Sequence, residues 1–122
     1  MIRNFEKITE ELTTEELALI PILISGFKLR SKTNPVKAPE VVRGMSLYIV
    51  QHNLKIKFTE PRLRKCVNFI RANGLIPLIA TSNGYYVSTN KEEILGQIES
   101  LKQRANSMLN GASGLLKYIN EN

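Results

Sequence analysis

The residues with the clearest capacity for chemistry in this chain are four cations and one amide packed into ten consecutive positions. They are Arg62, Arg64, Lys65, Asn68 and Arg71. Guanidinium groups bind phosphates and guanine edges, and amides bind adenine edges, so these side chains suit a helix in the major groove of DNA. On a helical wheel all five lie outside the apolar stripe of the same segment, which comprises Leu63, Cys66, Val67 and Ile70. An ordinary amphipathic surface helix would show the same pattern, and that alternative stays open.

The remaining inventory of reactive side chains excludes most catalytic sites. The 122 residues include 11 acids, all of them Glu, with one His and one Cys. A Ser-His-Asp triad, an Asp-based two-metal site, a Cys/His zinc site and an internal disulfide are therefore excluded. We expect a protein that is not an enzyme and that uses neither a metal nor another cofactor.

The net charge of +6 is concentrated in the middle of the chain. Residues 28–71 hold 11 bases and 2 acids, whereas residues 1–27 carry a net charge of −3 and residues 72–122 are neutral. A concentrated basic segment predicts a surface that faces a polyanion, although a solvated basic face would give the same count. We expect double-stranded DNA as the partner, with Lys37 among the phosphate contacts.

Two helices and a basic loop are predicted in the first half of the chain. Thr13 followed by Glu16 is a capping-box pattern, and the helix that it opens should run to about residue 30. A basic loop over residues 31–38 and a second helix over residues 39–51, opened by a proline, should follow. These two helices form the expected frame for the cationic segment.

A third helix and a hairpin are predicted next. Residues 54–58 alternate apolar side chains with lysine, which indicates a short strand or an extended loop. Thr59 is the expected N-cap of the third helix, and Gly74 is its expected C-terminal stop. Extended segments over residues 75–81 and 85–88, joined across an Asn-Gly dipeptide, predict a β-hairpin.

A long final helix should begin at Asn90, because Glu93 follows it at capping-box spacing. Its apolar residues recur at alternating intervals of four and three, which predicts a helix-helix seam and favours a homodimer. The seam comprises Ile94, Ile98, Leu101, Ala105, Met108, Ala112, Leu115 and Ile119. Packing of its first half on its own domain is the alternative, and Gly111 and Gly114 are possible points at which the helix breaks.

Residues 57–88, with the sequence KFTEPRLRKCVNFIRANGLIPLIATSNGYYVS, resemble the third helix and wing of small winged helix-turn-helix proteins of bacteria and their phages. A looser resemblance extends from Thr13 to Ser107. It implies an α+β fold with three helices, a hairpin wing and a long C-terminal helix. It also implies DNA binding by the third helix, over residues 60–73, with Ser82 and Asn83 at the wing tip.

The expected organisation is an N-terminal arm over residues 1–12, a winged-helix domain over 13–89 and a C-terminal dimerisation helix over 90–122. Such a protein would act in transcriptional regulation or replication in the cytoplasm of a bacterial cell or a phage-infected host. The alternative is a protein-interaction module that uses the same fold and the long helix without reading a DNA sequence. Transmembrane and secretory segments are not expected, because the longest apolar run has eight residues and contains a proline.

Two features depart from the family pattern. The second and third helices are separated by about eight residues rather than by a short turn. The wing carries no Lys or Arg between Leu75 and Ser88. Our hypothesis is that Lys55 and Lys57 replace the missing wing charge.

Overall fold

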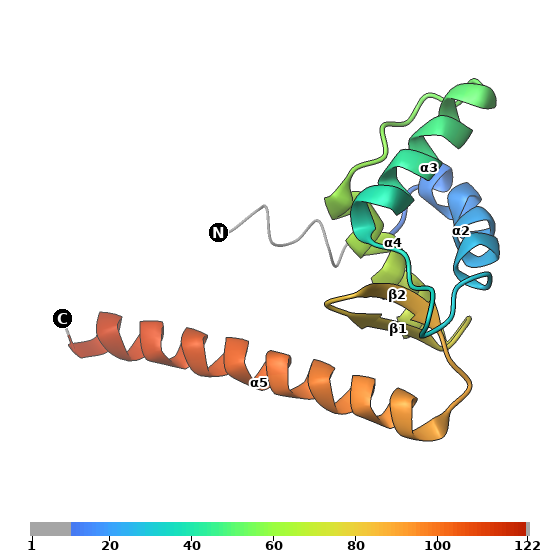
Figure 1. Ribbon diagram of the computed structural model, residues 1–122. Helices are drawn as coiled ribbons and strands as arrows, with labels where there is room; N and C mark the ends of the chain where they lie inside the picture. Colours follow the sequence, from blue (N-terminus) through green and yellow to red (C-terminus); the bar gives the residue numbers. More distant parts are fainter. Residues whose placement is uncertain (1–10, 122) are drawn as a thin grey trace. The chain divides into compact units, whose positions relative to one another are not determined.

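The computed structural model describes residues 11–121, which form parts of two compact units, Met1–Ser88 and Thr89–Asn122. The first unit contains α2 (Thr14–Phe27), α3 (Ala38–Gln51), α4 (Glu60–Ala72), β1 (Leu78–Thr81) and β2 (Gly84–Val87), and the second contains α5 (Lys91–Glu121). Three helices, an antiparallel hairpin and a long helix confirm the predicted α+β class (Figure 1). Most of the predicted N-terminal arm lies outside the described residues.

Helix α2 begins where the capping box predicts. The Thr13 amide donates to Glu16 Oε1 at 2.8 Å, and the Glu16 amide donates to Thr13 Oγ1 at 3.1 Å. Pro21 lies inside the helix without ending it. The helix ends at Phe27 rather than near residue 30, because the next backbone amides turn back to carbonyls of its last turn.

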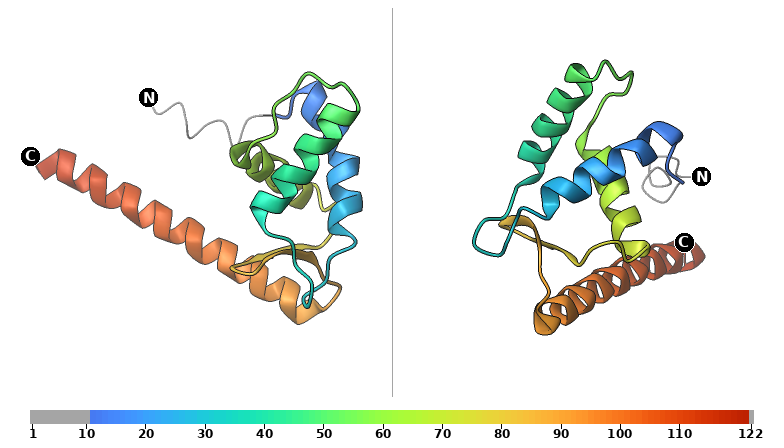
Figure 2. Two further views of the ribbon diagram at one scale, coloured as in Figure 1. Left: turned by 45° about the horizontal axis from the view of Figure 1, so that its top comes forward. Right: turned by 90° about the vertical axis from the view of Figure 1, so that its right-hand side faces the viewer.

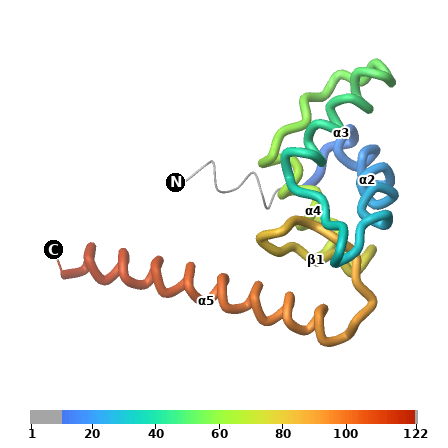
Figure 3. The backbone as a smooth tube through the Cα atoms, in the orientation of Figure 1, coloured from blue at the N-terminus to red at the C-terminus, as the bar shows by residue number. Residues whose placement is uncertain are grey.

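The segment between α2 and α3 is more ordered than the predicted basic loop. The Val36 amide donates to the Tyr85 carbonyl at 2.9 Å, and the Tyr85 amide donates to the Val36 carbonyl at 2.8 Å. This isolated antiparallel bridge attaches the segment to β2. In Figure 3 the chain passes beside the hairpin on its way from α2 to α3. Val36, which lies between the first two helices, thus pairs with the hairpin as a third, one-residue strand would. This arrangement is consistent with winged-helix topology.

Helices α3 and α4 confirm the predicted second and third helices to within one or two residues. The Arg62 amide donates to the Thr59 hydroxyl at 3.3 Å, which confirms Thr59 as the N-cap of α4. Gly74 adopts a φ of 59° just after α4, as a C-terminal stop requires. The connection between the helices contains no strand over residues 54–58 and follows an extended course (Figure 2).

The hairpin is present but shorter than predicted. Strands β1 and β2 pair antiparallel with Leu78 opposite Val87 and Thr81 opposite Gly84. The first strand begins at Leu78 rather than residue 75, because Pro77 has no amide hydrogen to contribute to a ladder.

One hydrophobic core holds the first unit together. Its buried residues come from all three helices, from the connecting segments and from the hairpin. The largest fully buried apolar side chains are Phe27, Leu19, Leu63 and Ile70. Helix α4 contacts both α2 and α3 as well as β1, so most of its circumference is covered.

Helix α5 is continuous over all 31 residues, including Gly111 and Gly114, so the alternative of a break at these glycines is wrong. Asn90 caps it, since its side-chain oxygen accepts from the amides of Glu92 at 2.9 Å and Glu93 at 3.1 Å. No side chain in it is buried. Among residues 11–121, no helix combines the length and apolar character that a membrane crossing requires.

Candidate nucleic-acid interface

The outward side of α4 presents a narrower set of polar residues than the sequence predicts. Arg64 and Asn68 are exposed, and Arg71, one turn further on, is half-buried. Intervals of four and three residues place them on one side of the helix. The Nε–H group of Arg71 donates to the Leu78 carbonyl at 3.3 Å, which ties this end of the stripe to β1.

Lys65 does not lie on this side, and its predicted outward position is wrong. Its side chain is 10% exposed, and its ammonium group donates to Glu16 Oε1 at 2.8 Å. The helical wheel fails here because it assumes one covered face, whereas α4 is covered by both α2 and α3. Lys65 is therefore part of the interior of the unit.

Arg62 is also drawn into this buried cluster. Its Nε–H group donates to Glu16 Oε2 at 2.8 Å, and its Nη1 donates to the Lys57 carbonyl. The side chain of Arg62 keeps 30% of its surface exposed. Two of the five polar side chains predicted on the outward face thus pair with the carboxylate of Glu16, whose sequence pattern predicts only a helix-capping role.

Glu16 is held in its charged form by these contacts. Burial acts to raise its pKa, but hydrogen bonds from Lys65, from the Thr13 backbone and from Arg62 outweigh this effect and lower the pKa to about 2. The carboxylate therefore pins the start of α2 to α4 at neutral pH. Glu16 precedes the buried residues Leu19, Ile20 and Leu23 at helical spacing, by three, four and seven positions. It therefore lies on the same face of α2, and this spacing is the signal in the sequence that could have revealed its burial.

This cluster makes the fold sensitive to acid. Because the pKa of Glu16 is lowered on folding, its stabilisation is complete above its unfolded pKa of 4.5 and is lost as the pH falls toward 2. We expect the free energy of unfolding, measured with urea, to fall by up to about 3 kcal/mol over this range from Glu16 alone. The wild type and Glu16→Gln should therefore differ less at pH 2.5 than at pH 6. An equal difference at both pH values would contradict the assignment.

The hairpin lies close enough to α4 for arginine charges on the helix to affect the pKa of a hairpin tyrosine. Burial raises the pKa of Tyr85 in β2, and the charges of Arg71 and Arg64 act in the opposite direction. Ser82 and Asn83 are exposed at the hairpin tip. Two residues of the stripe, Arg64 and Arg71, therefore act electrostatically on Tyr85 of β2.

The hairpin has a cation beside it that its own sequence lacks. Lys37 is exposed and, together with Thr81, Ser82 and Gly84, lines a shallow hollow at the tip. The Val36–Tyr85 bridge holds it there. Lys55 and Lys57 are exposed in the α3–α4 connection. Lys37 therefore brings a positive charge to the hairpin tip. The Lys57 carbonyl accepts a hydrogen bond from Arg62 in the first turn of α4, and a role of Lys55 and Lys57 beside the wing stays a prediction.

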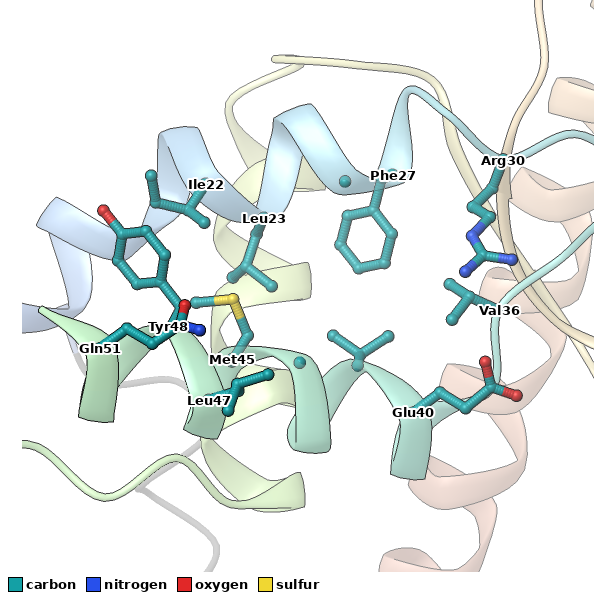
Figure 4. Close-up of a pocket in the computed structure, with 13 residues that line it drawn as sticks. Ile22, Leu23, Phe27, Arg30, Val36, Glu40, Met45, Leu47, Tyr48 and Gln51 are labelled. Atoms are coloured by element: carbon teal, nitrogen blue, oxygen red, sulfur yellow. The ribbon is translucent and has the colours of Figure 1, made fainter.

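A separate apolar groove lies between α2 and α3. Its volume is about 390 Å³, and Leu23, Phe27 and Met45 line its middle. Figure 4 shows polar groups only toward its ends, with Arg30 and Glu40 at one end and Tyr48 and Gln51 at the other. Gly26 and Gly44 also line it, and a Cβ at either glycine would meet no atom within 4 Å. The groove therefore suits apolar groups.

The one cysteine of the chain is in an unreactive setting. Cys66 is buried, as its place on the apolar stripe predicts, and burial raises the pKa of its thiol to about 11. Within residues 11–121, no group of three or more His, Cys, Asp or Glu side chains is arranged to hold a metal ion.

Comparison of the chain with protein-family models, curated proteins and solved structures gave no match.

Proposed function

We propose that the first unit binds double-stranded DNA, with α4 in the major groove and the hairpin beside it on the backbone. The observation that carries this proposal is the stripe of Arg64, Asn68 and Arg71 on one side of α4, which a hydrogen bond from Arg71 to the Leu78 carbonyl joins to β1. Arginine can pair with guanine edges and asparagine with adenine edges. Lys65 and Arg62 have a structural role in this proposal, since they pair with Glu16.

Phosphate contacts would come from the exposed lysines around this stripe. Lys37 stands at the hairpin tip, and Lys55 and Lys57 precede the first turn of α4. Phosphate contacts of this kind would fix the position of α4 on the duplex, whereas the contacts of the stripe with base edges would supply sequence preference. We place the activity in transcriptional regulation or replication in a bacterial cell or its phage, as the family resemblance implies.

Salt-dependent binding tests the proposal. We expect the protein to bind random duplex DNA at 50 mM salt, and the slope of log K against log salt to fall by about 0.9 for each phosphate contact removed. Lys37→Ala should reduce the slope by one such step, and the Lys55→Ala/Lys57→Ala double variant by up to two. Arg64→Ala and Asn68→Ala should instead change which sequences a random pool yields. Fluorescence anisotropy and selection from that pool measure the two effects.

The matched control is Arg43→Ala, which removes an equal charge from an exposed position on α3. It should leave sequence preference unchanged. Failure of the protein to bind duplex DNA at 50 mM salt would exclude DNA binding. The second candidate, a protein-interaction module, would then be favoured by the apolar groove between α2 and α3.

A further inference from the structure

Helix α5 presents a long apolar face that nothing in its own unit covers. Every side chain from residue 101 to residue 121 is exposed. The exposed fractions of its large apolar residues range from 38% at Leu101 to 71% at Leu115. These residues are Leu95, Ile98, Leu101, Met108, Leu109, Leu115, Leu116, Tyr118 and Ile119. An apolar stripe of this length on a helix indicates a second helix that packs against it.

The stripe is wider than the predicted seam. Written as heptads, the seam places Ile98, Ala105, Ala112 and Ile119 at position a and Ile94, Leu101, Met108 and Leu115 at position d. A third apolar row, Leu95, Leu109 and Leu116, follows at position e and is interrupted only by Lys102. A partner helix must therefore cover the a and d positions and also shield the leucines at one flank.

We propose that α5 pairs with α5 of a second copy, and that the two helices run antiparallel. Antiparallel pairing brings each a residue level with a d residue of the other helix. One register does this for the whole seam, with Ile94 opposite Ile119, Ile98 opposite Leu115, Leu101 opposite Ala112 and Ala105 opposite Met108. The two-fold axis repeats each of these layers, so all eight seam residues are used.

Side-chain volume favours this direction over a parallel pair. In the antiparallel register both alanines face a large residue, Ala112 against Leu101 and Ala105 against Met108. A parallel, in-register pair would place each alanine opposite its own copy and leave two thin layers in the seam. Alternation of large and small residues fills an interface evenly, whereas paired alanines leave gaps.

The flanks are also compatible with self-association. Across the antiparallel e flank Leu95 lies near Leu116 of the second copy, and Lys102 lies near Leu109, which its methylene groups can cover. Across the g flank Arg104 lies near Gly111 of the second copy. Lys102 and Arg104 are the charged residues at e and g positions of α5, and neither meets a like charge. A second copy therefore fits without repulsion.

Disulfide trapping tests both the partner and the direction. Ile98→Cys and Leu115→Cys are made separately in the full-length protein, and buried Cys66 does not compete. We expect a covalent dimer when the two variants are mixed and none from either alone. In the antiparallel pair, residue 98 lies about 25 Å along the axis from residue 98 of the second copy, too far for a disulfide. Gln103→Cys mixed with Lys117→Cys, both at position f, should give none.

Sedimentation equilibrium supplies the second measurement. Met108→Lys places two ammonium groups near the two-fold axis and should weaken the dimer at least about tenfold, whereas Asn110→Lys adds the same charge on the opposite side and should not. Wild-type protein that stays monomeric at high micromolar concentration would overturn self-association. A disulfide formed by either single variant with itself would overturn the antiparallel direction.

Discussion

Replacing Glu16 by glutamine is expected to lower the free energy of unfolding by about 3–5 kcal/mol, measured with urea at pH 7. The side chain is 2% exposed, and its carboxylate accepts from Lys65 and Arg62 at 2.8 Å each. The substitution keeps the shape and the hydrogen-bonding capacity of the cap but removes the charge. It leaves the ammonium group of Lys65 buried beside a neutral amide, and the cost of that uncompensated charge dominates the effect.

A double substitution separates the charge from the packing. Adding Lys65→Met to Glu16→Gln removes the stranded ammonium group, while Arg62 can hydrate because it is partly exposed. The double variant should therefore recover much of the lost stability. Glu15→Gln, an exposed acid in the same first turn of α2, is the matched control and should change stability by less than about 0.5 kcal/mol. A Glu16→Gln variant as stable as this control would show that the cluster contributes little.

The helices and the hairpin could be predicted because their signals are local. Thr13, Thr59 and Asn90 each cap a helix within three residues of their own position, and those hydrogen bonds are present. The connections were less predictable where a distant segment decides their course. The segment after α2 pairs with β2 through Val36, and no local pattern signals that pairing.

The candidate interface was predictable only in part, for the same reason. Arg64 and Asn68 are exposed as the wheel predicts, since that side of α4 is uncovered. Lys65 was misplaced because its partner, Glu16, lies 49 residues earlier in the chain. The proximity of Lys37 to the hairpin tip likewise depends on a pairing between residues far apart in sequence. Whether these residues contact DNA stays a prediction.

Replacing Gly84 by alanine is expected to destabilise the first unit by at least about 2–3 kcal/mol. The backbone φ at Gly84 is 127°, a region that side-chain-bearing residues rarely adopt. A Cβ there would also lie 2.5 Å from the Val36 carbonyl oxygen, which the bridge to Tyr85 holds in place. Either the hairpin turn or the Val36 bridge must give way, and urea unfolding measures the loss.

The same substitution should move Lys37 away from the hairpin tip, because Lys37 follows Val36 directly. We therefore expect Gly84→Ala to lower the salt slope of DNA binding as Lys37→Ala does, under conditions where the variant remains folded. Gly44→Ala is the matched control: Gly44 lies inside α3, and a Cβ there would meet no atom within 4 Å. Gly44→Ala should raise the free energy of unfolding by up to about 1 kcal/mol through helix propensity. The two glycine substitutions should therefore change the free energy of unfolding in opposite directions. A Gly84→Ala variant as stable as the wild type would mean that the bridge does not fix the wing.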